Sequence, residues 1–314
     1  MIFALLLSSV LTFVQYNTEN LFDCQHDSLK QDTEFLPEGA RRWTRTKYWR
    51  KLNHISQAII SCGGDSTTWK LPDLVALCEV ENDTVMRDLT RRSLLRKARY
   101  EYVMTSSPDV RGIDVALMYS PFSFKLLRSY PLRINVPPKY SPTRDILYAC
   151  GRLVGGDTLH VFVVHAPSRR GGERVSRPFR LLVAGRLCQS VDSIRALSSD
   201  ARIVVAGDFN DYSDDPAILK LAQNKLVNVS RQAMGTNGAQ GTYKYRGSWG
   251  SLDHIFCTSS MLQRAPKTFI NDSPFLLMPD SRYGGMQPRR NYHGYKYNNG
   301  FSDHLPLVVT FFIE

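Results

Sequence analysis

The fold of this chain is predicted best by one stretch of its sequence, Val204-Val205-Ala206-Gly207-Asp208-Phe209-Asn210-Asp211. A short apolar, β-branched run that stops at Gly, Asp and Asn is typical of a buried strand. It places a carboxylate and a carboxamide at the end of a strand, where open α/β sheets bind their ligands. Asp208 and Asn210 are two residues apart, so their side chains point to the same side of an extended backbone. Taken alone, such a stretch is more often a strand closed by an Asx-type turn.

Five further strand-like runs also carry polar or ionisable residues at one end. Each end alone is a weak signal, because strand ends are commonly polar. Six such ends in one chain are hard to obtain by chance, and together they predict one shared site. The five are Asn17 after Val14-Gln15-Tyr16, Glu79 after Val75-Ala76-Leu77-Cys78, His165 after Val161-Phe162-Val163-Val164, Asp253 near the start of Leu252-Asp253-His254-Ile255-Phe256, and Asp303-His304 before Leu305-Pro306-Leu307-Val308-Val309.

At these residues the chain resembles the endonuclease/exonuclease/phosphatase superfamily, which includes DNase I-like nucleases, exonuclease III-type apurinic endonucleases, sphingomyelinases and inositol polyphosphate phosphatases. The motifs run from near the start to near the end, so the resemblance covers essentially the whole chain. As a set they are specific for the superfamily but say little about the substrate. The matching motifs are Tyr16-Asn17-Thr18-Glu19-Asn20-Leu21, Cys78-Glu79, His165-Ala166-Pro167, Gly207-Asp208-Phe209-Asn210, Leu252-Asp253-His254 and Ser302-Asp303-His304.

Strand-rich halves with interspersed helices predict two packed sheets covered by helices. The resemblance implies the same α/β class, a four-layer α/β/β/α sandwich of two mixed sheets flanked by helices, as in DNase I. Because the motifs are spread throughout and must converge, we expect one domain over residues 1–314. Hydrophobic periodicity predicts helices at 44–62, 82–96 and 176–197, a short helix after Pro216, and strands at 100–105, 115–119, 124–127, 147–154, 159–164, 252–257 and 305–312.

The composition is basic. Lys and Arg number 40 against 29 Asp and Glu, which gives a net charge of +11. Such a surface attracts polyanions, either nucleic acid or anionic lipid headgroups, although solubility alone also explains a net charge. Arg residues near the motifs favour phosphate as the ligand. The six Cys form no C-x-x-C pair, and we expect no disulfide framework.

The first eleven residues are open to two interpretations. Residues 1–11 are apolar, as in the core of an export signal, but lack a preceding Lys or Arg and a clear cleavage site. A remnant of an export signal and an extension of the first strand are equally good explanations, so both the cytoplasm and export to the cell envelope stay open. No other run is long enough to span a bilayer, and a monomer is the favoured oligomeric state.

Phosphoester hydrolysis needs a Lewis acid, an activated water and stabilisation of charge. Oxygen ligands suit Mg²⁺, with Mn²⁺ as a substitute, and Mg²⁺ takes few protein carboxylates. Glu79 is the first choice of ligand, assisted by Asp303 and Asn17. The resemblance adds Glu19, the acidic residue after the Asn, which a solvated loop acid explains nearly as well.

His304 is the candidate general base, because imidazole titrates near neutrality. The resemblance pairs it with Asp253, which would fix the tautomer of its ring. Asp208 would orient the attacking water or serve as the base itself, and Asn210 would donate its amide to a phosphoryl oxygen. His165 would bind the phosphate or protonate the leaving oxygen, as the histidine of DNase I-like and sphingomyelinase-like members does.

Further phosphate contacts are sought among Arg residues, whose forked side chains match phosphate. Arg111, Arg144 and Arg169 lie in loops before strands or after the His165 motif, where solvated surface is the alternative. Residues 271–300 form a long insertion in which aromatics alternate with Arg, including Tyr283 and Arg289. Such a segment would stack a base or cover a headgroup, or be a packed surface loop.

These residues predict a Mg²⁺-dependent phosphoester hydrolase, most simply a phosphodiesterase or nuclease that uses a His-Asp-assisted water. One alternative with the same chemistry acts on a small phosphorylated headgroup of a lipid, inositol or sugar. A second alternative, of another class, is a non-catalytic phosphate-binding module. Nucleic acid is the expected macromolecular partner if the first prediction holds.

Overall fold

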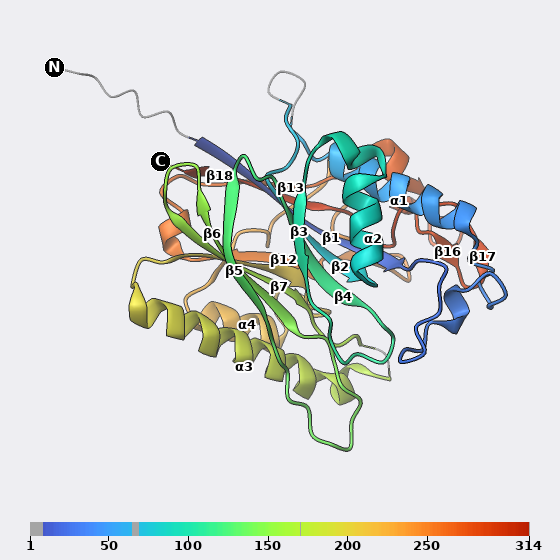
Figure 1. The fold of residues 1–314 in the computed structure, drawn as a ribbon, viewed down its shortest axis with the longest axis horizontal. Coiled ribbons are helices and arrows are strands. Elements are labelled where there is room, and N and C mark those ends of the chain that lie inside the picture. Colours follow the sequence, from blue (N-terminus) through green and yellow to red (C-terminus); the bar gives the residue numbers. More distant parts are fainter. Residues whose placement is uncertain (1–8, 65–68, 170, 314) are drawn as a thin grey trace.

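The computed structural model describes residues 9–64, 69–169 and 171–313. Two six-stranded mixed sheets pack face to face, with α1 and α2 outside one sheet and α3 and α4 outside the other (Figure 1). This is the four-layer α/β/β/α sandwich that the sequence predicts, which is confirmed. The strand that contains Asp208 lies near the centre of its sheet, as its apolar run requires.

The first sheet has the strand order β13-β18-β1-β2-β4-β3. Its central strands β1 and β2 are parallel, with Phe13 opposite Leu74, and β18 runs antiparallel to β1. The two ends of the described chain therefore lie side by side, because Ser9 pairs with Ile313. The strands are β1 (Ser9–Leu21), β2 (Leu74–Val80), β3 (Glu101–Met104), β4 (Asp114–Tyr119), β13 (Lys267–Ile270) and β18 (Leu307–Ile313).

The second sheet has the order β5-β6-β7-β8-β12-β9. It repeats the arrangement of the first, because its central strands β7 and β8 are parallel and β12 runs antiparallel to β8. The strands are β5 (Phe124–Leu132), β6 (Ile146–Leu153), β7 (Thr158–His165), β8 (Arg202–Asp208), β9 (Val227–Asn228) and β12 (Asp253–Cys257).

The core is divided by the alternation of side chains along the strands. In β7, Val161 and Val163 belong to the core shared by the two sheets, whereas Phe162 and Val164 pack beneath α3 and α4. Fully burying one such side chain contributes about 1.5–3 kcal/mol. A strand apolar on both faces is therefore fixed in register, and so is the residue at its end.

The four helices begin near residues with a cap or a turn. Asn82 caps α2 as predicted, because its Oδ1 accepts a hydrogen bond from the Val85 N–H at 3.0 Å. Two glycines with positive φ, Gly171 and Gly172, precede α3, which begins three residues earlier than the sequence predicts. The helices are α1 (Arg45–Ile60), α2 (Asp83–Arg91), α3 (Glu173–Leu197) and α4 (Pro216–Gln223), with 3-10 turns at Thr33–Phe35, Leu94–Lys97, Ser259–Met261 and Pro274–Leu276.

Two predicted element ends are wrong. α2 stops at Arg91 rather than residue 96, because the Ser93 hydroxyl accepts the Leu95 N–H and starts a separate 3-10 turn. β5 continues past residue 127 to Leu132. Its pairing with β6 shifts between Leu126 and Arg128, and only its first and last residues are buried, so the run shows no alternation of buried and exposed residues.

The insertion at residues 271–300 is locally structured. Two small hairpins, β14 (Leu277–Pro279) with β15 (Met286–Pro288) and β16 (Tyr292–His293) with β17 (Lys296–Tyr297), occupy most of it. A third hairpin, β10 (Tyr243–Tyr245) with β11 (Ser248–Gly250), precedes β12. All three hairpins lie outside the main sheets.

Three smaller expectations can be compared with the structure. All six cysteines are free, which confirms that there is no disulfide framework. None of the helices in the described ranges has the length and apolar character of a membrane span. β1 begins at Ser9, so residues 9–11 belong to the first strand, while the rest of the apolar stretch lies outside the described residues.

Candidate active site

The C-terminal ends of four central strands meet at one cavity. Parallel neighbours end at the same edge of a sheet, and β1 and β2 in one sheet and β7 and β8 in the other bring Asn17, Glu79, His165 and Asp208 together. All four line a cavity of about 580 Å³. The other lining residues are Ser168, Arg169, Glu173, Asn210, Tyr212, Tyr243, Tyr245, Leu252, Asp303 and His304.

Hydrogen bonds join the two sheets at the floor of this cavity. The Asn17 amide Nδ2 donates to Asp208 Oδ2 at 2.9 Å, and the Asn210 backbone N–H donates to Asp208 Oδ1 at 2.8 Å. The Asp208 carboxylate is therefore held by a donor on each oxygen. The Asn210 amide Nδ2 donates to the Ala166 carbonyl at 3.1 Å, and its second N–H has no partner among the described residues.

Glu79 lies at a break in the regular strand geometry. The pairing of β2 with β4 shifts between Cys78 and Val80, and the backbone of Glu79 adopts a φ of 63°. A left-handed conformation costs a non-glycine residue about 1–2 kcal/mol, and bulges of this kind re-aim side chains next to functional sites. Here the side chain turns to the cavity, where the Asn20 N–H donates to Glu79 Oε2 at 2.8 Å.

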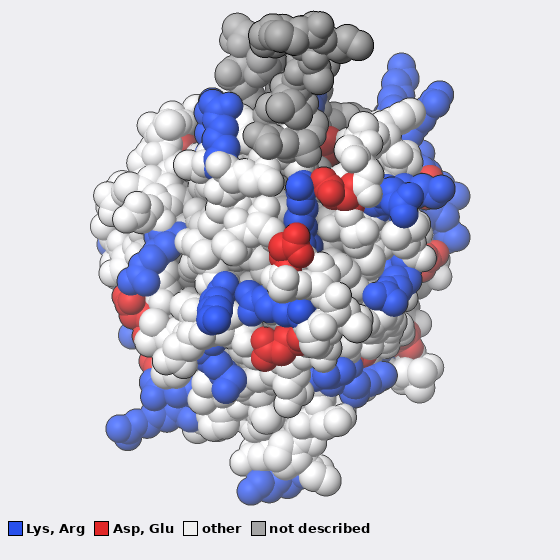
Figure 2. Space-filling view, turned by 90° about the vertical axis from the view of Figure 1, so that its left-hand side faces the viewer, with Lys and Arg blue, Asp and Glu red and all other residues white. Residues whose placement is uncertain are grey.

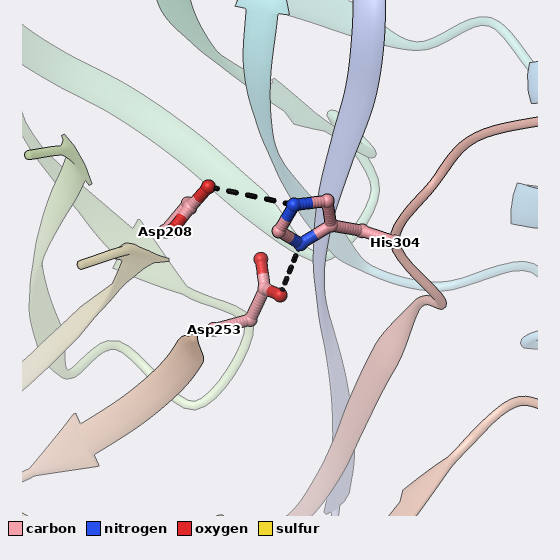
Figure 3. A group of neighbouring side chains, drawn as sticks. All are labelled: Asp208, Asp253 and His304. Carbon is pink, nitrogen blue, oxygen red and sulfur yellow. Dashed lines mark hydrogen bonds and ion pairs between the residues drawn. The ribbon is translucent and has the colours of Figure 1, made fainter. Parts of the chain in front are cut away.

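His304 lies between two carboxylates (Figure 3). Its Nδ1 is hydrogen-bonded to Asp253 Oδ2 at 2.7 Å, and its Nε2 lies 3.8 Å from Asp208 Oδ2. Asp253 is itself fixed, because the Thr242 hydroxyl donates to Oδ2 at 2.6 Å and the Gln15 amide donates to Oδ1 at 3.4 Å. Asp208 and Asp253 pair directly across β8 and β12, so the sheet register sets the spacing of this array.

The array is buried, and its pKa values are shifted accordingly. Burial alone would lower the pKa of His304, but Asp253 and Asp208 outweigh it and raise that pKa well above the usual range. Burial raises the pKa of Asp208 to about 7, against the lowering effect of His304. Perturbed groups of this kind are typical of functional sites. The array can therefore hold or release a proton near neutral pH.

Glu79 and Asp303 offer carboxylate oxygens to a cation. Glu79 Oε1 has no hydrogen bond among the described residues, and its nearest nitrogen neighbours are His165 Nε2 at 3.8 Å and the cationic Arg111 Nη2 at 3.9 Å. Asp303 receives a hydrogen bond from Arg290 at 2.9 Å on Oδ2 only. Both side chains are partly open to the cavity. This hard-oxygen donor set fits Mg²⁺ or Mn²⁺.

Glu19 lies next to Asp303 but does not line the cavity that holds Glu79 and Asp208. It lines a neighbouring cavity of about 160 Å³ that Asp303 also lines, and its Oε2 accepts the Asn291 N–H at 2.6 Å. Burial, followed by the Asp303 charge, raises the pKa of Glu19 to about 7. The buried Lys51 lies 4.0 Å away and offsets part of the negative charge. The structure therefore brings together Asn17, Glu79 and Asp303 but sets Glu19 apart.

His165 faces the array from the second sheet. Its Nε2 lies 3.8 Å from Glu79 Oε1 and 3.9 Å from Asp208 Oδ2, and its Nδ1 is buried with no partner in the described chain. Burial, Arg144 and Arg111 lower its pKa well below the usual range. The ring is therefore neutral at pH 7.

Arg144 and Arg111 differ in their surroundings. Arg144 is buried, pairs with Asp109 at 3.0 Å, and donates to the backbone carbonyls of His165 and Ala166. It supports the end of β7 and does not line the cavity. Arg111 is more exposed and donates to Asn20 Oδ1 at 2.6 Å, next to Glu79.

The remaining predicted contacts are spread over different surfaces. Arg169 lines the same cavity as Glu79 and Asp208, but its guanidinium is engaged by Glu173 at 2.7 Å and Asp215 at 3.1 Å. Tyr283 lines a different, adjacent cavity. Arg289 lies 5.9 Å from the ring centre of Phe301 and lines neither.

Several residues at the site gave no signal in the sequence. Tyr212, Tyr243 and Tyr245 line the cavity from loops and from the β10–β11 hairpin, which has no motif. Thr242 fixes Asp253 through a contact that depends on the same hairpin. Gln15 could have been found, because it lies two residues before Asn17 and so on the same face of β1.

Comparison with solved structures finds the same fold at low sequence identity. An endonuclease/exonuclease/phosphatase family protein from Bacteroides thetaiotaomicron has a TM-score of 0.63 at 12% identity, with 98% of this chain and 99% of that chain covered. The human nocturnin catalytic domain with bound sulfate gives 0.58 at 19%, with 96% and 94% covered. Truncated Caenorhabditis elegans TDP2 gives 0.58 at 16%, with 96% and 97% covered. At these identities the likeness concerns the fold alone.

Sequence comparison identifies the family directly. No curated protein matches the sequence. A model of the Endonuclease/Exonuclease/phosphatase family, however, matches residues 12–313. That match runs from β1 to β18 and contains all six strand-end motifs. The chain therefore belongs to the endonuclease/exonuclease/phosphatase family.

Proposed function

We propose that this chain is a phosphodiesterase of the nuclease type that depends on Mg²⁺ or Mn²⁺. Family membership supports a phosphoesterase in general. The observation that carries the finer proposal is the buried array of Asp253, His304 and Asp208 on the same cavity as Glu79 and Asp303. Proton transfer and metal binding are thereby available at neighbouring positions, which metal-assisted hydrolysis requires.

Glu79 and Asp303 would hold the metal, with Asn17 beside them and Glu19 balancing charge behind Asp303. When bound, the metal would polarise a phosphoryl oxygen and offset the charge that develops on it. The residues present fit such an ion, because Glu79 and Asp303 are partly open to the cavity and each keeps one carboxylate oxygen without a hydrogen bond among the described residues.

The other residues take separate roles in the proposal. The proton of the attacking water passes to the array, with Asp253 holding the His304 ring in a fixed orientation. Asp208 shares this proton, because its raised pKa of about 7 brings it near neutral pH. Asn210 donates its free amide hydrogen to a phosphoryl oxygen. His165, being neutral, binds a phosphoryl oxygen through a ring N–H or assists the leaving oxygen.

Two alternatives are tested by the same experiment. Wild-type protein is assayed on bis(4-nitrophenyl) phosphate, 4-nitrophenyl phosphate, oligonucleotides, sphingomyelin and inositol phosphates, with Mg²⁺, with Mn²⁺ and with EDTA. We expect hydrolysis of diesters that EDTA abolishes. Activity confined to inositol phosphates or other small headgroups would favour the headgroup alternative. Tight binding of ligands without turnover of any would favour the binding module.

An isosteric pair of variants tests the metal position. Glu79→Gln removes a proposed ligand at the bulge of β2 and should raise the Mg²⁺ concentration for half-maximal activity by about tenfold or more. Glu101→Gln makes the same change on β3 of the same sheet, where the side chain is exposed and pairs with Arg91. The control should match wild type. Equal metal requirements in both variants would remove Glu79 from the metal site.

A further inference from the structure

We propose that a second cavity, between the β10–β11 and β14–β15 hairpins, binds single-stranded nucleic acid beside the catalytic cavity. This inference rests on the proposed phosphodiesterase function and names its substrate class. The second cavity has a volume of about 870 Å³. Tyr243 and Tyr245 line both cavities, so a strand cleaved in one would pass directly into the other.

The two hairpins form a fixed wall rather than two independent loops. Lys244 in β10 donates to the Gly284 carbonyl at 2.7 Å and forms an ion pair with Asp280 at 3.0 Å. Both charged side chains are buried in this contact. Asp280 is the only acidic residue in the cavity's described lining, and Lys244 already neutralises it. The wall therefore presents no free negative charge to an anion.

The cavity holds cations without partners. Arg246, Arg282 and Lys296 line it and are exposed, and none has an acidic partner among the described residues. Arg169 in the catalytic cavity, by contrast, is paired with two carboxylates. Unpaired guanidinium and ammonium groups on one concave surface are suited to consecutive phosphates.

Exposed aromatic rings accompany these cations. Tyr245 is 54% exposed and Tyr283 is 46% exposed. The guanidinium of Arg246 lies 5.3 Å from the Tyr245 ring centre, and that of Arg282 lies 5.2 Å from the Tyr283 ring centre. Each exposed tyrosine ring thus has a cation over one of its faces, and aromatic rings combined with cations bind bases and phosphates in single-strand sites.

This chemistry favours a single strand over the alternatives. A duplex keeps its bases paired and stacked inside, so the tyrosine faces would have nothing to stack on. A small headgroup would fit within the catalytic cavity and leave the second one unused. A lipid surface needs exposed aliphatic side chains, whereas the large hydrophobic residues exposed in this lining are Tyr245 and Tyr283.

The positive net charge is not concentrated at the second cavity. Figure 2 shows Lys and Arg spread over the left-hand side of Figure 1, where β1 begins and β18 ends. That face lies at the opposite end of the strands from Asn17, Glu79 and Asp208. The excess of +11 is therefore not confined to the site, whereas the unpaired cations Arg246, Arg282 and Lys296 all line one cavity.

The test measures binding without catalysis. Fluorescence anisotropy with a labelled 12-nucleotide DNA or RNA strand is recorded in EDTA over a series of salt concentrations. Arg246→Asn/Arg282→Gln removes two cations, and Asn suits the left-handed turn at position 246, where φ is 48°. We expect the slope of log affinity against log salt to become shallower by about 1.4, or about 0.7 for each lost phosphate contact.

A matched control removes the same charge elsewhere. Arg96→Gln/Lys97→Gln alters two exposed cations beside Tyr100, whose hydroxyl donates to the Pro72 carbonyl before β2, at the end of the sheet far from Glu79. Its salt slope should stay within about 0.3 of wild type. Tyr245→Leu/Tyr283→Leu keeps the cations and should weaken binding about tenfold or more, with little change in slope.

Three outcomes would overturn the inference: no binding of either strand at low salt, equal slopes in the cavity variant and the control, or tighter binding of a duplex or of phosphatidylglycerol vesicles than of the single strand. Hydrolysis of bis(4-nitrophenyl) phosphate by wild type with Mg²⁺ or Mn²⁺ is measured in parallel. If that hydrolysis occurs and the strand does not bind, the inference alone fails. If the strand binds and no diester is hydrolysed, the proposed function fails.

Discussion

The dipeptide Asp-His occurs twice in this chain, and the two copies contribute different residues to the site. At Asp253-His254 the aspartate reaches the site, where it bonds His304, while His254 is fully buried behind it. The ring of His254 is held by the Asp211 carbonyl at 2.9 Å and by the Asn228 amide at 3.2 Å. At Asp303-His304 both residues line the cavity.

The difference arises from the phase of the strands. β12 begins at Asp253, so alternation sends Asp253 to the core between the sheets and His254 to the opposite face. β18 begins only at Leu307, and the second pair lies before it in irregular backbone. There Ser302 donates to the Asn17 carbonyl at 2.7 Å and accepts the His304 N–H at 3.1 Å. A motif therefore acquires its role from its position relative to the strand.

The largest expected effect separates the two histidines by activity. His304→Ala should lower kcat by about 10²- to 10⁴-fold, because it removes the ring that we propose to take part in moving the proton of the attacking water. His254→Ala, corrected for the folded fraction, should change kcat by less than about threefold. Steady-state hydrolysis of bis(4-nitrophenyl) phosphate with saturating Mg²⁺ measures both.

A double variant sharpens the assignment. If Asp253 acts only through His304, Asp253→Asn added to His304→Ala should lower kcat little further, since residues that act as a unit are non-additive. Full turnover by His304→Ala would transfer the role of base to Asp208. Multiplicative losses would mean that Asp253 acts independently.

The sequence predicts the site residues that lie at strand ends better than those that depend on contacts between distant segments. The two-sheet sandwich follows from apolar runs whose alternation is local, and residues at the ends of such runs must meet where parallel strands end. Asn17, Glu79, His165 and Asp208 could therefore be proposed as one group. The phase of a strand is less certain, because a single bulge, as at Glu79, reverses the direction of a side chain.

Contacts between distant segments could not be predicted in this way. Glu19 accepts a hydrogen bond from the N–H of Asn291, which is 272 residues away in the sequence. Only the folded insertion brings Asn291 close to Glu19. Arg144 is of the residue type that suits a phosphate contact, but its side chain is buried against Asp109. The tyrosines of the β10–β11 hairpin belong to no motif. Tertiary packing decides these positions, and no local pattern records it.

The second prediction concerns stability, where replacing His254 should have a larger effect than replacing His304. His254→Ala leaves the Asp211 carbonyl without its donor and opens a cavity between Phe209 and Phe256, whose rings flank it. We expect a loss of about 2–4 kcal/mol in the free energy of unfolding, measured by urea denaturation in EDTA. A smaller loss than that of His304→Ala would contradict the structural role of His254.

The third prediction separates the two aspartates. Asp303→Asn should raise the Mg²⁺ concentration for half-maximal activity by about tenfold, because it removes a proposed ligand oxygen. Asp253→Asn should lower kcat but leave the Mg²⁺ requirement unchanged, because its carboxylate faces Thr242, Gln15 and His304. Metal titrations of activity distinguish them, and a shifted Mg²⁺ requirement in Asp253→Asn would show that the two sites are not separate.

The smallest expected effect is the pH dependence of stability, which should have opposite signs at the two histidines. Asp253 and Asp208 outweigh burial and raise the pKa of His304, so its stabilisation is complete below the unfolded pKa of about 6.5 and is lost as pH rises through the raised value. Burial lowers the pKa of His254, so its contribution is present above about 6.5 and is lost as pH falls through the lowered value. The free energy of unfolding is measured by urea denaturation in EDTA at pH 5 to 9. His304→Gln should destabilise the protein most at acid pH, and His254→Gln should destabilise it most at alkaline pH. The difference in free energy of unfolding between wild type and each variant should change by on the order of 1 kcal/mol across this range. Parallel curves for the two variants would mean that both rings have similar electrostatic surroundings, and the division between the two Asp-His pairs would then be lost.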